Sequence, residues 1–317
     1  MKSIVIYYTM SGNTKKIAEA IHAGMNESSG GKSDIARLRE IEMKDLLDYD
    51  LIGLGSPVFN SREPSVVAKF IQETMRSVDG KYAFAFSTHG ALPGYYFAMV
   101  VPAMIQRGLT VIGWDDWFCD VVYPVTPSPY FITGHPDAID IEEAKAFGKE
   151  MVDRSHRISE GEIDLIPTFP RGKAYDDIYV PVEVPPTKEY PEEWDKLLKA
   201  IEGVEFKVNT EKCKYPRCTI CIDNCPVGSI DFSNSPPKFH ANCEKCFHCE
   251  QICPNGSIET DYEAFKSAHD LFTDVLLKQS LEFFEAQGRF RRLTPLKDIG
   301  WNTPFWKSRK HPRYKIK

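Results

Sequence analysis

The sequence of 317 residues has no apolar run long enough to cross a membrane. Its longest nearly apolar stretch, residues 95–105, contains Pro102 and is well short of the roughly 20 residues that a transmembrane helix needs. There is no excess of basic charge either, because the net charge is −6, so we do not expect nucleic-acid binding. With 42% apolar and 26% charged residues the composition is that of a globular protein, and the length predicts two domains.

Cysteine is rare outside one short segment. Eight of the nine cysteines lie in a window of 41 residues from Cys213 to Cys253, and Cys119 lies elsewhere, which argues against a disulfide framework spread over the fold. The apolar run at residues 4–8 is too short for the apolar region of a signal peptide and predicts a strand instead. We therefore expect a cytoplasmic protein, in which clustered cysteines indicate metal or redox chemistry and Cys119 is a buried spectator.

Residues 1–160 alternate between signals for buried strands and signals for helices. Continuous apolar runs predict strands, and apolar residues spaced by three or four predict helices. The predicted strands are residues 4–8, 35–38, 51–55, 82–86 and 110–114, with 35–38 as a short edge strand, and the predicted helices are residues 14–25, 64–75, 95–107 and 141–158. Repeated strand–helix units indicate an α/β fold with a doubly wound parallel sheet.

The rest of the chain has a different composition. Residues 161–212 contain six prolines and are predicted to form an extended linker that ends in one helix at residues 191–203. Residues 213–260 hold the clustered cysteines. Residues 261–317 are predicted to form a long helix, residues 262–287, and a basic tail with a charge of +9 over residues 289–317. Because aromatic residues interleave the tail's charges, we expect the tail to pack on its own domain.

The clustered cysteines lie in an internal repeat. The motif Cys-x2-Cys-x3-Cys-Pro-x-Gly-Ser-Ile begins at Cys218 and recurs at Cys246, with an offset of 28 residues. A further cysteine precedes each copy, Cys213 before the first and Cys243 before the second, and the first copy is wider by two residues. The second copy has the spacing of a bacterial [4Fe–4S] ligand run.

Two such runs predict two clusters, because in two-cluster proteins the fourth cysteine of each run binds the cluster of the other run. The rule assigns Cys213, Cys218, Cys221 and Cys253 to one cluster and Cys225, Cys243, Cys246 and Cys249 to the other. Two zinc sites are the alternative, but zinc sites favour Cys-x2-Cys pairs that are separated by a longer loop. This segment resembles a bacterial-type two-[4Fe–4S] ferredoxin domain, which implies a small α+β fold and one-electron transfer.

A hydroxyl-rich loop follows the first predicted strand and begins the first predicted helix. Its residues are Thr9, Met10, Ser11, Gly12, Asn13 and Thr14. Hydroxyl groups, a flexible glycine and backbone N–H groups at a helix start can hold a phosphate, although a capped helix start is the alternative interpretation. There is no P-loop lysine and no GxGxxG motif, so the loop fits neither a nucleoside triphosphate nor a dinucleotide.

Two further loops follow predicted strands and are expected at the same edge of the sheet. One holds Ser56, Pro57, Val58, Phe59 and Asn60, and the other holds Ser87, Thr88, His89, Gly90 and Gly94. Open α/β sheets bind ligands at the carboxyl ends of their strands, and these loops carry aromatic rings and backbone groups suited to a flat heteroaromatic ligand. His89 either contacts the polar edge of such a ligand or shapes the loop.

With these three loops, residues 1–160 resemble the flavodoxin family. The resemblance implies FMN as the cofactor, with its phosphate in the loop of residues 9–14 and its ring between the other two loops, where Phe59 is the first candidate for a ring contact. A flavodoxin-like half followed by a two-cluster ferredoxin half resembles the EFR1-type ferredoxins, over residues 1–160 and 210–260.

This combination implies a protein that relays low-potential electrons between FMN, two [4Fe–4S] clusters and external redox partner proteins. Two alternatives are FMN-dependent reduction of a small acceptor, such as a quinone or an enone, and a subunit of a larger reductase. An enzyme needs a proton donor, for which His89, Tyr95 and Tyr96 are candidates. The sequence names neither the electron donor nor the acceptor, nor an oligomeric state.

Overall fold

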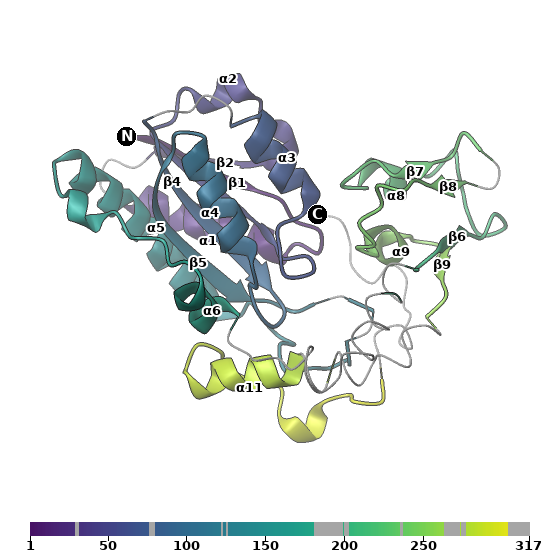
Figure 1. Cartoon of the computed structure of the whole chain (residues 1–317). Helices are drawn as coiled ribbons and strands as arrows, with labels where there is room; N and C mark the ends of the chain where they lie inside the picture. The colour runs from purple at the N-terminus through teal and green to yellow at the C-terminus, as the bar shows by residue number, and fades with distance from the viewer. Residues whose placement is uncertain are drawn as a thin grey trace. The chain divides into compact units, whose positions relative to one another are not determined.

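The computed structural model describes residues 1–28, 32–75, 80–121, 123–124, 126–180, 199, 203–234, 237–262, 273 and 277–303. The chain divides into two compact units, Met1–Asp120 with Gly134–Pro181, and Val121–Thr133 with Val182–Lys317 (Figure 1). Most of the helix predicted over residues 191–203, the first part of the helix predicted over residues 262–287 and the tail from residue 304 lie outside the described residues.

The first unit is built on a five-stranded parallel sheet (Figure 1). Its strands are β1 (Lys2–Tyr7), β2 (Lys32–Arg37), β3 (Leu51–Pro57), β4 (Tyr82–His89) and β5 (Thr110–Phe118), in the order β2-β1-β3-β4-β5. Every neighbouring pair is parallel, so the predicted doubly wound sheet is confirmed, with β2 at one edge. Strand β5 continues to Phe118, past its predicted end at Trp114, because polar Asp115 and Asp116 interrupt the apolar run that marks a strand.

Helices cover both faces of this sheet because alternate strand residues point to opposite faces. The helices of this part are α1 (Asn13–Glu27), α2 (Met43–Leu46), α3 (Ser65–Glu73), α4 (Tyr96–Gln106) and α5 (Ala138–Ser159). Ile4 and Ile6 of β1 lie in one apolar core with residues of α3 and α4. Val5 and Tyr7 lie in a second core with residues of α1 and α5. The sheet is therefore packed between helices on both faces, which holds its strands in register.

Helices α1 and α5 approach each other through two glycines. A Cβ atom on Gly24 would lie 1.8 Å from the carbonyl oxygen of Lys145, and one on Gly148 would lie 2.0 Å from the carbonyl oxygen of Ile21. Because these neighbours are backbone atoms, there is no room for a side chain at either position. The position of α1, which begins directly after the hydroxyl-rich loop, depends on this contact.

Part of the predicted linker is a helix that packs on the first unit. Helix α6 (Lys173–Tyr179) buries Tyr175 and Tyr179 in the core that covers α3 and α4. The Tyr175 hydroxyl donates a hydrogen bond to the carbonyl oxygen of Gly94 at 2.7 Å and so holds a predicted cofactor loop. The compact unit continues to Pro181, past residue 160. A helix of seven residues among prolines has too few turns to produce a clear periodic signal.

The second unit repeats one local structure at each cysteine motif. Helix α8 (Ile220–Asp223) is followed by strand β7 (Ile230–Asp231), and α9 (His248–Ile252) is followed by β9 (Ile258–Thr260). The antiparallel partner of β7 is β8 (Lys238–Phe239), and that of β9 is β6 (Phe206–Val208). Both the two helices and the two strands begin 28 residues apart, so the sequence repeat is also a structural repeat.

The described part of the C-terminal region packs within this second unit. Helix α11 (Lys278–Ala286) buries Leu281 and Phe284. The Trp301 ring lies edge-on to the rings of Tyr130 and Phe131, with a centroid distance of 5.8 Å to each. The described tail residues therefore pack within the second unit, which also takes in residues 121–133, a segment that the sequence assigned to the first domain.

The glycine contact between α1 and α5 predicts the effect of one substitution. Ala is a better helix former than Gly by about 1 kcal/mol, yet Gly148→Ala should lower the free energy of unfolding by about 1–3 kcal/mol, because the new methyl group meets the Ile21 carbonyl. Denaturant unfolding measures this change. The control is Ala146→Gly on the exposed side of α5, which should cost about 1 kcal/mol from helix propensity alone. A Gly148→Ala variant as stable as the wild type would contradict the prediction.

Candidate functional site

Three predicted loops meet at one edge of the sheet of the first unit. They follow β1, β3 and β4, whose parallel register sets Tyr7 beside Gly55 and Pro57 beside Thr88. Strand β1 lies between β2 and β3, so the connections that leave this part of the sheet diverge to opposite faces. Such a switch point is where open α/β sheets bind ligands.

The loop after β1 leaves polar groups at the start of α1. Gly12 precedes the helix with a φ of +95°, a backbone conformation that favours glycine. The Thr9 hydroxyl accepts a hydrogen bond from the Gly12 N–H at 3.2 Å. Among the described residues, Ser11 makes no side-chain hydrogen bond. Its hydroxyl and the N–H groups of the first helical turn are thus available to an anion.

Two other side chains of this loop bind to the fold itself. Asn13 Nδ2 donates to the carbonyl oxygen of Asp120 at 2.8 Å. The hydroxyls of Thr14 and Thr88 lie 2.8 Å apart, and both residues are buried. These bonds hold the loop against neighbouring segments. Since the hydroxyls of Thr9 and Thr14 already have partners in the fold, the predicted hydroxyl contact with a phosphate depends chiefly on Ser11.

The loop after β3 forms a tight hairpin. Asn60 and Ser61 have φ values of 47° and 63°, and the backbones of Phe59 and Arg62 exchange hydrogen bonds of 2.8 and 3.0 Å. Positive φ at both central residues is typical of the two-residue turn that suits twisted strands. The Phe59 ring lies edge-on to the Tyr8 ring with a centroid distance of 6.3 Å, so the loops after β1 and β3 are brought together.

The loops after β3 and β4 are bonded to each other. The Tyr95 N–H donates to the Ser61 carbonyl at 2.7 Å, and the Val58 N–H donates to the Thr88 carbonyl at 3.0 Å. A Cβ atom on Gly94, whose φ is +56°, would lie 2.6 Å from the Ser61 Cβ. Gly94 therefore lets the two loops touch, which is a role that the sequence alone did not reveal.

Strand β4 ends in two buried polar groups without partners. Ser87 Oγ and His89 Nδ1 are buried and make no hydrogen bond within the described part of the chain. The two residues are two positions apart on a strand and so lie on the same face. Because proteins seldom leave buried polar atoms unpaired, these two mark a place where a ligand or a water molecule supplies the partner.

The other nitrogen of His89 is held by a carboxylate. His89 Nε2 lies 2.8 Å from Asp116 Oδ2, and the two side chains are 1% and 5% exposed. The Phe118 ring lies edge-on to the imidazole at 4.6 Å. Asp116 fixes the orientation of the imidazole, so His89 also shapes the site. Sequence reasoning missed Asp116 because it fell beyond the predicted end of β5.

The other candidate proton donors lie in different environments. Tyr96 is fully buried, its hydroxyl donates to the Phe86 carbonyl at 3.1 Å, and burial raises its pKa. Tyr95 is 49% exposed. Glu63, which sequence reasoning did not single out, is a buried carboxyl beside the hairpin, and burial raises its pKa. Tyr96 is therefore a structural residue of the core.

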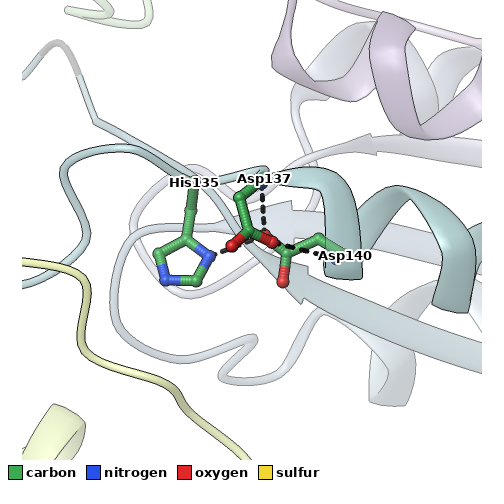
Figure 2. A group of neighbouring side chains, drawn as sticks. All are labelled: His135, Asp137 and Asp140. Carbon is green, nitrogen blue, oxygen red and sulfur yellow. Dashed lines mark hydrogen bonds and ion pairs between the residues drawn. The ribbon is translucent and has the colours of Figure 1, made fainter.

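His135, Asp137 and Asp140 lie close together at the start of α5, where His135 and Asp140 are buried and Asp137 is half-buried (Figure 2). Asp140 Oδ2 accepts hydrogen bonds from His135 Nδ1 and from the Asp137 N–H, both at 2.6 Å. Asp137 Oδ1 accepts from the N–H groups of Ile139 and Asp140. These are the bonds of a helix cap, so the carboxylates already serve the fold and the group is not assigned to a metal.

In the second unit, four cysteines from both repeats line one cavity. The cavity is small, about 20 Å³, and its cysteines are Cys225 from the first run and Cys243, Cys246 and Cys249 from the second. Phe206 and Phe247 supply part of its apolar wall. The structure therefore brings together the cysteines that the crossing rule assigns to one cluster.

The remaining four cysteines include Cys221 and the three that lie near it. Burial, together with the smaller effects of the neighbouring Cys253, Cys213 and Cys218, raises the pKa of Cys221 to about 12. Burial likewise raises the pKa of Cys246 to about 12. Buried thiols with raised pKa values stay protonated unless a cation compensates the charge of the thiolates. Both groups are thus suited to a metal centre.

His248 and Cys119 are buried residues that belong to neither cysteine group. His248, between Cys246 and Cys249 in the sequence, is buried at the start of α9, and desolvation lowers its pKa to about 4. It is therefore neutral at physiological pH. Cys119 is buried in the core between α1 and α5, as expected of a spectator, and burial raises its pKa well above the usual value.

The N-terminal half of this chain is similar in sequence to flavodoxins. The family model of the flavodoxin domain matches residues 4–94. An uncharacterized protein of Methanocaldococcus jannaschii is 27% identical over 159 residues, which are 48% of this chain and 99% of that protein. A flavodoxin of Aquifex aeolicus is 32% identical over 123 residues, 37% of this chain and 66% of that protein.

Two other similar proteins are an enzyme and a flavodoxin of known structure. An NAD(P)H dehydrogenase (quinone) of Caulobacter vibrioides is 28% identical over 143 residues, 36% of this chain and 71% of that protein. Among solved structures, a flavodoxin from the domain Archaea has 24% identity and a TM-score of 0.40, covering 49% of this chain and 99% of that chain. Within the described ranges, each helix is too short or too polar to cross a membrane. The N-terminal half of this chain is a flavodoxin-like domain.

Proposed function

We propose that this chain is an EFR1-type electron-transfer protein whose flavodoxin-like half carries FMN and whose cysteine-rich half carries two [4Fe–4S] clusters. Its function is to relay low-potential electrons between these centres and external redox proteins in the cytoplasm. The observation that carries this proposal is the cavity in which Cys225 joins Cys243, Cys246 and Cys249, because crossing of ligands between two runs is typical of two-cluster ferredoxins.

FMN fits the edge at which the three loops meet. The Ser11 hydroxyl and the first N–H groups of α1 would hold its phosphate. Ser87 Oγ and His89 Nδ1, buried without partners among the described residues, offer hydrogen bonds to its ring system. The relatives named flavodoxin support the same cofactor. FMN supplies the exchange of one or two electrons.

Iron–sulfur clusters fit the cysteine groups better than zinc does. Each group holds a thiol with a raised pKa, Cys221 in one and Cys246 in the other, that needs a cation to ionise, and neither group consists of two Cys-x2-Cys pairs. Backbone N–H groups of Ser229 and Ser257 donate to the sulfur atoms of Cys225 and Cys253 at 3.2 Å, which stabilises thiolates. A [4Fe–4S] cluster supplies the exchange of one electron.

The residues of the chain position these centres and keep water away from them. Phe206 and Phe247 cover the group of Cys246, and burial there lowers the local dielectric constant. In the first unit, Asp116 orients the imidazole of His89, and the hairpin at Ser61 holds the loop at Gly94. These contacts tune the potential of each centre by fixing the groups that face it.

Reduction of a quinone by bound FMN is the second candidate function. One relative is an NAD(P)H dehydrogenase (quinone), and the buried pair of His89 and Asp116 has the chemistry of a proton donor. Turnover of a quinone by the purified chain without a partner protein favours this candidate. Electron transfer that requires a partner protein favours the relay.

Iron content tests the assignment of ligands to clusters. The chain purified without oxygen should contain about eight iron atoms, four for each cluster, and one FMN. Cys225→Ser should retain about four iron atoms, because it removes one ligand of the group of Cys246 and leaves the group of Cys221 intact. Iron, sulfide and flavin analysis measures this.

The matched control for this experiment is Cys119→Ala. It also removes a cysteine, but Cys119 lies in the core of the first unit, so about eight iron atoms should remain. Zinc in place of iron, or full iron content in Cys225→Ser, would contradict the proposal.

The loop at Gly12 tests the FMN site. Gly12→Ala should weaken FMN binding to the apoprotein about tenfold, because a side chain at φ +95° costs roughly 1–2 kcal/mol in the conformation that binds. Quenching of flavin fluorescence measures the dissociation constant. Gly161→Ala is the control, since Gly161 has a φ of +109° and equally open surroundings after α5. Equal affinities of the two variants would refute the assignment of this loop.

A further inference from the structure

Each copy of the cysteine repeat places a buried serine against a sulfur atom. Ser229 lies four residues after Cys225, and Ser257 lies four residues after Cys253. In both copies the serine N–H donates to the cysteine Sγ at 3.2 Å. The hydroxyl oxygens differ, because Ser257 Oγ lies 3.0 Å from the sulfur of Cys253 and Ser229 Oγ lies 3.7 Å from that of Cys225.

The chemistry of a metal ligand fixes the direction of these hydroxyl bonds. A cysteine that binds a metal is a thiolate and has no proton to donate, so the serine hydroxyl is the donor. Ser229 and Ser257 are 0% and 3% exposed, which keeps water from competing for the bond. In the part of the chain that the structure describes, the cysteine sulfur is the hydrogen-bond partner of each hydroxyl.

We propose that the Ser257 hydroxyl raises the reduction potential of the cluster bound by Cys253, and that Ser229 does the same more weakly for the cluster bound by Cys225. This inference rests on the proposed function. Reduction adds one electron from an external one-electron donor to a cluster, and no proton or bond is exchanged. The added negative charge strengthens a hydrogen bond to the ligand sulfur, so the bond stabilises the reduced state more than the oxidised state.

The backbone N–H bonds to sulfur serve as a reference for comparing the two hydroxyl bonds. Because the N–H to sulfur distance is 3.2 Å in both copies, the backbone bonds do not distinguish the two clusters. The difference of 0.7 Å lies in the hydroxyl bonds, and 3.7 Å is close to the limit for a bond to sulfur. The hydroxyl bonds thereby contribute unequally to the potentials of the two clusters, which helps to set the order in which the clusters accept electrons.

Redox titration monitored by electron paramagnetic resonance tests the inference in the full chain. Ser257→Ala removes the hydroxyl and keeps the N–H bond. It should lower the reduction potential of the cluster bound by Cys253. At a fixed ambient potential, the ratio of reduced to oxidised cluster should fall about tenfold, which corresponds to a shift of about 59 mV in the reduction potential. Ser229→Ala should shift the other cluster by less. Both variants should keep the iron content of the wild type.

The outcomes separate this inference from the proposed function. Wild-type chain without iron would overturn the proposed function, and the inference with it. Variants with full iron content and unchanged potentials, or a larger shift in Ser229→Ala than in Ser257→Ala, would overturn the inference alone. If Ser257→Ala fails to retain iron, Ser229→Ala decides, because an unchanged potential in that variant contradicts a role of the hydroxyl bonds.

Discussion

The parallel register of β1, β3 and β4 is the constraint on which the first unit depends. Because the strands run the same way and end together, the three loops that follow them meet at one edge. A slip of one residue would turn Ile4 and Ile6 toward α1 and α5, and Val5 toward α3 and α4. The two apolar cores on the faces of the sheet therefore hold the strands in register, and the strands in turn hold the three loops of the candidate site in place.

The second unit depends instead on how the charge of its cysteine thiolates is compensated. Its strands have two or three residues each, and the apolar core around Phe206 and Phe247 is small. Most of its eight clustered cysteines are half-buried, and desolvation makes the ionisation of the Cys221, Cys246 and Cys249 thiols unfavourable by raising their pKa. In such a unit, a bound cation contributes to folding as well as to function, because it binds the folded arrangement of ligands.

The strands and main helices could be predicted because each depends on its own apolar pattern. The sites could be predicted only in part, because a ligand loop has no pattern of its own. Ser87 and His89 were identified from their place after a strand, whereas Asp116 was missed because polar residues hid the end of β5. Helix α6 was missed for a similar reason, since a short helix among prolines gives a weak signal, yet Tyr175 holds the loop at Gly94.

By itself, the sequence determined the succession of strands and main helices in residues 1–160, the 28-residue repeat and the kinds of groups available to bind ligands. These properties depend on neighbouring residues, so they can be read along the chain. Tertiary structure alone decided that His89 meets Asp116, that Ser61 touches Gly94 and that one serine hydroxyl lies closer to its cysteine than the other. The reason is physical: such contacts depend on strand length, backbone conformation and packing, to which distant parts of the chain contribute together.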